Sequence, residues 1–176
     1  VYALGGITSS YENAGTAIRV ADEQMGTVIS SHHQVVWERG GSFLMNRVAG
    51  INLQKTGDGI SSIGACAHMV LKANHYSVDA KELTATGKSV YGMLDKYMDR
   101  PVNLSGVNLE QALYFVSGGK PVIAMTGDSS AVVISGYDQS TITILNPNTG
   151  KEENVGRKQA EDIFKAAGNH FISYMS

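Results

Sequence analysis

The chain has 176 residues, of which 43% are hydrophobic and 17% are charged, and its formal net charge is -2. This length suits one domain with a packed core, or a core with a short appendage, and the low charge excludes a solvated, disordered chain. No basic run is longer than Arg157-Lys158, which excludes the concentrated cationic face of a nucleic-acid-binding protein. The longest apolar runs, such as Ala131 to Ile134, are too short to span a membrane, so we expect no membrane contact within this segment.

Residues 1 to about 50 are predicted to form an N-terminal extension or small lobe packed on the core. A helix is predicted from Tyr11 to Met25, with Ser10 as its N-cap. Gln34 to Glu38 and Phe43 to Arg47 are short and mixed, and we expect a hairpin across Gly40-Gly41 to join them. Within the lobe, Trp37 is interpreted as the residue that anchors this part on the core.

Helical spacing of apolar residues continues after residue 60. A strong helix begins near Ser61 or Ser62, and its stripe is Ile63, Cys66, Ala67, Val70 and Leu71. Three more helices are predicted, with caps at their starts: Ala80 to Ala85 behind Asp79, Val90 to Met98 behind Ser89, and Asn108 to Val116 with Asn108 and Gln111 as a capping box.

The hydrophobic period then changes from 3.6 to 2, which indicates strands. The predicted strands are Pro121 to Met125, Ala131 to Tyr137, Thr141 to Leu145, Glu152 to Val155 and Phe171 to Met175. Most of the turns between them are too short for a parallel crossover, so we expect antiparallel pairing. One helix, Arg157 to Ala167, interrupts the set. Helices followed by an antiparallel sheet predict an α+β fold.

Three segments, taken together, resemble the C39-like branch of the papain-like cysteine peptidases. The first is Ser62-Ile63-Gly64-Ala65-Cys66-Ala67-His68-Met69-Val70-Leu71, which is similar to the family's cysteine-bearing helix. The second and third are Ser130-Ala131-Val132-Val133-Ile134-Ser135-Gly136-Tyr137-Asp138 and Thr143-Ile144-Leu145-Asn146-Pro147-Asn148-Thr149-Gly150, which are similar to its histidine strand and to the strand that follows. The resemblance covers roughly residues 50 to 176. It implies a papain-like fold, with residues 51–176 as the C39-peptidase-like domain.

The resemblance also implies where a catalytic site would lie. Ser62 stands at the position of the family's nucleophile and Ser130 at that of its histidine, while Asn146 matches the residue that orients the imidazole. Gln54 is a candidate for the oxyanion position. A thiol peptidase needs a thiolate and an imidazole, and a serine hydroxyl cannot replace the imidazole as general base near pH 7. We therefore expect a catalytically inactive, degenerate member of the family, and not an enzyme.

The inactive domain is predicted to be a peptide- or protein-binding module of a larger bacterial envelope or secreted protein, or a structural one. The alternative is an active cysteine peptidase that uses Cys66 with a histidine outside the family pattern, such as His170 or His68. Cys66 lies about one turn inside its helix on the apolar stripe, and free cysteines there are usually small core residues. Asn146 also has a simpler interpretation, because Asn-Pro at a strand end is common turn chemistry.

No cofactor or metal site is expected from the sequence. The adjacent pair His32-His33 makes no metal clamp by itself, and His68 and His75 are seven residues apart instead of the usual four. The chain begins at Val1 without a signal-peptide pattern, which indicates a chain trimmed at its start. The resemblance implies other domains of a longer chain as partners. The resemblance implies an extracytoplasmic setting, secreted or in the cell envelope.

Overall fold

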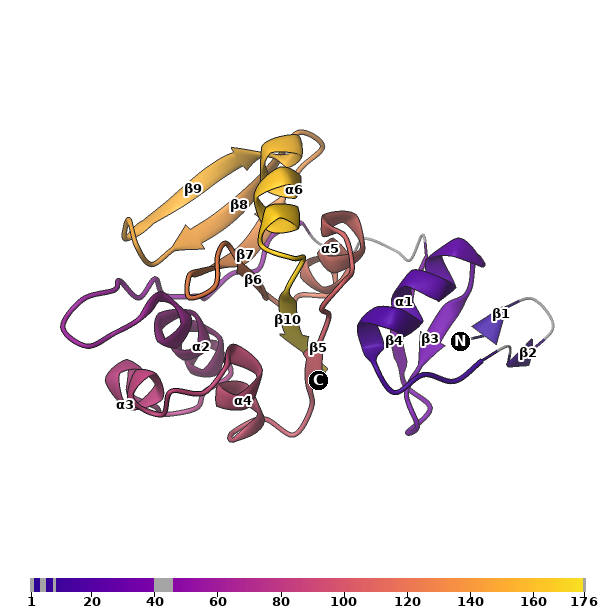
Figure 1. Cartoon of the computed structure of the whole chain (residues 1–176), viewed down its shortest axis with the longest axis horizontal. Coiled ribbons are helices and arrows are strands. Elements are labelled where there is room, and N and C mark those ends of the chain that lie inside the picture. Colours follow the sequence, from indigo (N-terminus) through magenta and orange to yellow (C-terminus); the bar gives the residue numbers. More distant parts are fainter. Residues whose placement is uncertain (1, 4–5, 8, 40–45, 176) are drawn as a thin grey trace.

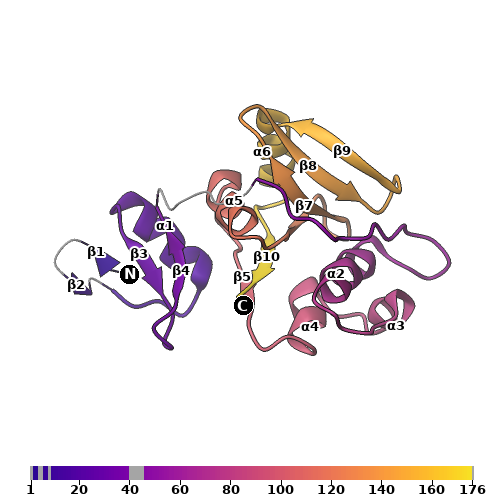
Figure 2. The same cartoon turned by 180° about the vertical axis from the view of Figure 1, so that it is seen from behind.

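A computed structural model describes residues 2–3, 6–7, 9–39 and 46–175 of the chain, and Figures 1 and 2 show it from opposite sides. The main body is a six-stranded sheet with helices on both faces. The N-terminal part forms its own small sheet with one helix, which lies to one side of the main body (Figure 1). The predicted α+β arrangement is confirmed.

The main sheet has the strand order β5-β10-β6-β7-β8-β9, and every neighbouring pair is antiparallel, as predicted. Its strands are β5 (Pro101–Asn103), β6 (Val122–Met125), β7 (Ala131–Tyr137), β8 (Thr141–Asn146), β9 (Lys151–Gly156) and β10 (Phe171–Tyr174). Strand β5 was not predicted, because three residues beginning with a proline carry too little of the two-residue alternation. Strand β5 is held in place by its pairing with β10, which lies about 70 residues later in the sequence.

Alternate side chains of the strands enter two different cores. On β7, Val132 and Ile134 face the core covered by α5 (Leu109–Ser117) and α6 (Arg157–Ala166), whereas Ala131 and Val133 face the opposite one. That second core is covered by α2 (Ser62–Ala73), α3 (Ala80–Ala85) and α4 (Val90–Asp95). Because both faces are buried, the sheet is the middle layer of three.

The helix starts of the main body follow the predicted caps. Ser61, Asp79 and Ser89 each accept a backbone hydrogen bond at the start of α2, α3 and α4, and Asn108 with Gln111 forms the capping box of α5. Helix α4 ends at Asp95, three residues before the predicted end. Among the described residues, no helix is both long and apolar enough to cross a membrane.

The N-terminal sheet has the order β2-β1-β3-β4 and is covered by α1 (Ala14–Glu23). Its strands are β1 (Tyr2–Ala3), β2 (Gly6–Ile7), β3 (Thr27–Ile29) and β4 (Val35–Glu38). The prediction of Ser10 as N-cap is wrong. Asn13 caps α1, because its side-chain oxygen accepts a hydrogen bond from the Thr16 N–H at 3.1 Å. The predicted ends Tyr11 and Met25 lie outside the helix and are exposed.

The predicted hairpin across Gly40-Gly41 needs a correction. Strand β4 pairs with β3, which precedes it, so the hairpin lies on the other side of β4. Most of the predicted partner, residues 43–47, lies outside the described residues. Its last residue, Arg47, forms an isolated bridge with Gly136 of β7 and therefore belongs beside the main sheet.

The N-terminal part docks on α5 through polar and aromatic contacts. The Trp37 indole N–H donates to the Gln111 carbonyl at 3.2 Å, and the Trp37 ring lies 6.0 Å from that of Tyr114. The Gln111 side chain donates to Asp22 Oδ2 at 2.8 Å. Trp37 is buried and anchors this part on the main body, as predicted. The division at residue 50 into lobe and domain stays a prediction.

Candidate functional site

Ser62 is the first residue of α2 and joins that helix to the start of β7. Its hydroxyl donates to the Ser129 carbonyl at 3.3 Å and accepts from the Ala131 N–H at 3.1 Å. Both partners are backbone groups that flank Ser130 directly. The side chain is buried, and its donor and one acceptor position are occupied. The sequence positions 62 and 130 are therefore brought together, through the backbone of the loop that precedes β7.

Ser130 and Asn146 are connected by a residue that the sequence analysis did not single out. The Asn148 side chain donates to Ser130 Oγ at 3.1 Å, and the Asn148 backbone N–H donates to Asn146 Oδ1 at 3.1 Å. The second bond is an Asx-turn, which is the common chemistry of an Asn-Pro-Asn segment. That turn pattern could have pointed to Asn148 in the sequence, but its contact with Ser130 depends on the pairing of β7 with β8.

Asn146 has a carboxylate as its other partner. Its amide nitrogen donates to Glu153 Oε2 at 3.3 Å, and Glu153 Oε1 accepts from the Thr149 hydroxyl at 2.6 Å. Glu153 therefore stabilises the turn between β8 and β9. Asn146 acts as a turn residue here, with both ends of its amide engaged.

Gln54 lies in the segment that leads into α2. Its side-chain amide donates to the adjacent Lys55 carbonyl at 3.0 Å. Two residues later, the Thr56 N–H donates to the Pro147 carbonyl at 3.0 Å, which holds this segment beside the turn after Asn146. Gln54, Ser62, Ser130 and Asn146 thus lie on connected segments. The catalytic roles assigned to these positions stay predictions.

Cys66 lies apart from this group. Its side chain is fully buried in the core beneath the sheet, and burial raises the pKa of its thiol far above the ordinary value. A protonated, inaccessible thiol is neither a nucleophile nor a metal ligand. The position agrees with the interpretation of Cys66 as a small core residue.

Neither histidine considered as its partner is bonded to Cys66. His68 is two residues further along α2, and side chains two apart on a helix point to different faces. Its Nδ1 is buried and has no hydrogen-bond partner. The other candidate, His170, has its Nδ1 3.2 Å from the Ser105 hydroxyl. In the described part of the chain, no three His, Cys, Asp or Glu side chains are arranged to hold a metal ion.

Two cavities flank the loop of residues 126–130. One, of about 350 Å³, lies between this loop, the start of α4 and the end of α6, and its lining includes Ile63, Tyr91, Gly127, Asp128, His170 and Ile172. The other, of about 290 Å³, lies between the sheet and α6, and its lining includes Thr126, Ile144, Asn146, Asn148, Glu153 and Ile163. Both combine apolar walls with a few polar groups, which is the usual character of a ligand site.

The group at Ser62 and Ser130 is neutral and hydrogen-bonded. Its members are two hydroxyls, two amides and backbone groups, and the adjoining Glu153 carboxylate is used by the turn. Neither a hydroxyl nor an amide has the basicity near neutral pH that would activate an alcohol. The arrangement can donate and accept hydrogen bonds.

The chain matches the model of the Peptidase_C39 like family over residues 54–172. Its structure resembles a Bacillus anthracis protein described as a C39-like peptidase, with a TM-score of 0.66 and 17% identity over 75% of this chain and 98% of that one. It also resembles a double glycine motif protease from an AMS/PCAT transporter, solved in complex with a leader peptide. That likeness has a TM-score of 0.56 and 14% identity, over 75% of this chain and 99% of the other. A comparison with curated protein sequences finds no match.

Proposed function

Because the chain belongs to the Peptidase_C39 like family, we propose that it is a peptidase-like domain that binds a peptide or protein segment without cleaving it. The observation that carries the proposal is the Ser62 hydroxyl, which bonds to the backbone on both sides of Ser130. Position 62, which the resemblance assigns to the nucleophile, fastens α2 to the start of β7 here, while Ser130, assigned to the base, bonds to Asn148.

The chemistry supports the absence of cleavage. A thiol peptidase must generate a thiolate beside an imidazole, and the thiol of Cys66, the chain's single cysteine, is buried in the core. Ser62 has no base among its hydrogen-bond partners, and Ser130 bonds to an amide. Without general base and activated nucleophile, the rate advantage of such a site is lost.

The shape of the surface supports binding. A peptide laid across the loop of residues 126–130 would have a partly apolar cavity on either side for its side chains. The protease with the leader peptide shows that a protein of this fold binds a peptide. We extend peptide binding to this chain, as part of a longer envelope or secreted bacterial protein.

The cleavage arm of the test uses peptides from a tryptic digest of casein. We expect mass spectrometry to find no new peptide ends after prolonged incubation, and no labelling of the native protein by an iodoacetamide probe at pH 7. Appearance of new ends that is blocked by iodoacetamide would contradict the proposal and favour a cysteine peptidase.

The binding arm follows backbone amide signals by NMR while the same digest is added to the full chain. We expect shifts at Ile63, Gly127 and Asp128, and their loss in the Gly127→Trp variant. A side chain at Gly127 meets only ordinary contact, 3.9 Å from Ser130 Cβ, so the variant blocks the cavity without straining the backbone. The control is Lys81→Trp on the exposed face of α3. Equal shifts in wild type and Gly127→Trp, or none in wild type, would contradict peptide binding at this loop.

A further inference from the structure

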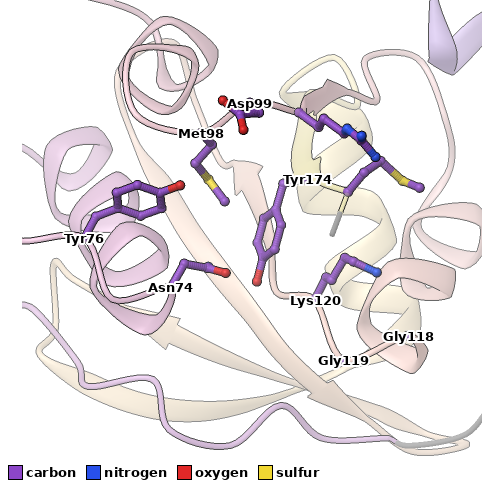
Figure 3. Close-up of a pocket in the computed structure, with 10 residues that line it drawn as sticks. Asn74, Tyr76, Met98, Asp99, Gly118, Gly119, Lys120 and Tyr174 are labelled. Atoms are coloured by element: carbon purple, nitrogen blue, oxygen red, sulfur yellow. The ribbon is translucent and has the colours of Figure 1, made fainter. Parts of the chain in front are cut away.

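A third cavity, of about 520 Å³, lies at the opposite end of α2 from Ser62 (Figure 3). The 12 residues of α2 span about 18 Å, so this cavity is separate from the two at the loop of residues 126–130. It lies where the end of α2 meets the α4–β5 connection, the α5–β6 connection and the end of β10. The lining includes Asn74, Met98, Arg100, Gly118, Lys120 and Tyr174.

Lys120 is a charged side chain of this cavity without an ion-pair partner in the described part of the chain. The side chain is partly buried, and burial lowers the pKa of its ammonium group. None of the ion pairs found among the described residues includes Lys120, and neither do their side-chain hydrogen bonds. A desolvated ammonium without a counter-ion gains from an anion placed beside it.

Positive charges outnumber negative ones among the residues that line the cavity. Arg100 adds a second positive charge and donates to Gln34, while Asp99 is the one acidic residue among those lining the cavity. Asp99 is exposed, and Figure 3 shows it on the other side of the Tyr174 ring from Lys120. The lining therefore carries a net positive charge, with Lys120 on the side away from Asp99.

The backbone around Lys120 argues against a phosphate ligand. The N–H groups of Gly118, Gly119 and Lys120 already donate to carbonyls of α5, so they cannot form the cradle that phosphate sites use. Asn74 and Gly118 are the C-caps of α2 and α5, and helix C-termini carry partial negative charge. A single negative charge on the ligand suits this setting better than two.

Part of the remaining wall is apolar. Met98 and the rings of Tyr76 and Tyr174 line the cavity, and Figure 3 shows Met98 between the two rings. The Tyr174 side chain lies beside Asn74, and its ring is part of the surface offered to a ligand (Figure 3). A volume of this size accommodates a ligand somewhat larger than an amino acid.

We propose that this cavity binds a small organic monocarboxylate with an apolar group, and that the Lys120 ammonium is its counter-ion. The carboxylate lies against Lys120, and the apolar group packs on the ring of Tyr174. This site is independent of peptide binding at the loop of residues 126–130.

The test is an NMR titration of the full chain with N-acetylphenylalanine and, separately, with its neutral amide. We expect saturable shifts of the backbone amides of Asn74, Gly119 and Lys120 with the acid. The amide, which has the same shape without the charge, should bind at least about tenfold more weakly because it lacks the ion pair. Phenyl phosphate should also bind more weakly than the acid, and tighter binding of phenyl phosphate would overturn the monocarboxylate assignment.

Two variants make the test specific. Lys120→Met keeps the aliphatic stem and should weaken binding of the acid at least about tenfold, whereas Lys165→Met on the exposed face of α6 should leave it unchanged. Preserved dispersion of the other amide signals establishes that each variant is folded. Equal affinity of wild type and Lys120→Met, equal affinity for acid and amide, or shifts confined to the loop of residues 126–130 would each overturn the proposal. A negative result at Lys120 does not affect the outcome of the Gly127→Trp experiment, so the two proposals can be contradicted independently.

Discussion

The Ser62 hydroxyl accepts a hydrogen bond from the Ala131 N–H at 3.1 Å and thereby joins the first residue of α2 to the first residue of β7. The two residues are far apart in sequence, and the bond is buried. A hydroxyl at the start of this helix is thus a structural link between the helical layer and the sheet.

Replacing Ser62 with alanine should destabilise the fold. The Ala131 N–H and the Ser129 carbonyl would lose their partner, and a buried unsatisfied group costs about 1–3 kcal/mol. Urea unfolding measures the loss. Ser31→Ala, at an exposed hydroxyl, should stay within about 0.5 kcal/mol of wild type. A Ser62→Ala variant as stable as wild type would show that the link contributes nothing.

A cysteine at position 62 together with a histidine at position 130 should produce a reactive thiol. Position 62 lies at a helix start, and position 130 lies between the two residues to which the Ser62 hydroxyl bonds. A Ser62→Cys/Ser130→His variant therefore places a thiol near an imidazole. An imidazolium lowers the pKa of a neighbouring thiol, so we expect labelling by iodoacetamide at pH 7 at least about tenfold faster than in Ser62→Cys alone. Equal rates in the two variants would argue against the assignment of Ser130 to the histidine position.

Cys66 should be inert in the folded protein. Burial raises the pKa of its thiol, so native protein should not react with a disulfide reagent such as DTNB between pH 7 and pH 9. Denatured protein should release one equivalent of thionitrobenzoate from DTNB, because the chain has one cysteine. Because the folded-state pKa is raised, the contribution of the buried Cys66 thiol to the free energy of unfolding is complete below the thiol's unfolded-state pKa. It declines as the pH rises above that value. Rapid reaction of the native thiol would instead revive Cys66 as a nucleophile.

The hydrogen bond from the Gln111 amide to Asp22 should contribute to the docking of the N-terminal part. Gln111→Glu keeps the oxygen that accepts from the Asn108 N–H but places a carboxylate against Asp22. We expect a loss of about 1 kcal/mol in unfolding free energy, and its recovery when Asp22→Asn supplies a donor. A double-mutant cycle by urea unfolding measures the coupling. Additive effects of the two substitutions would mean that the contact is not made in solution.

Lys120 should give stability a small pH dependence in the alkaline range. Its folded-state pKa is lowered from 10.5 by burial, so the unfolded chain binds more protons in the window between the two values. The stability of wild type relative to Lys120→Met should therefore rise with pH across that window and be constant below it. Since the side chain is half-exposed, we expect the change to stay below about 1 kcal/mol. Urea unfolding from pH 7 to pH 10.5 checks the sign.

Local features of the chain determined most of the main body in advance. Strands with two-residue alternation, such as Ala131–Tyr137, and caps such as Asp79 or the Asn108-Gln111 box depend on neighbours within a few residues. The serines at positions 62 and 130 are equally plain in the sequence. Where local signals were short or ambiguous, as at β5 and around α1, the predictions missed elements or misplaced their ends.

The tertiary structure alone decided how distant residues meet. The contact of Asn148 with Ser130, the burial of Cys66 beneath the sheet and the docking of Trp37 on Gln111 depend on strand pairing and layer packing. So does the cavity at Lys120, whose walls come from the end of α2, two connections and the end of β10. Periodicity and capping report on a residue's own turn or strand, whereas a site is made of side chains that only the folded chain brings into contact.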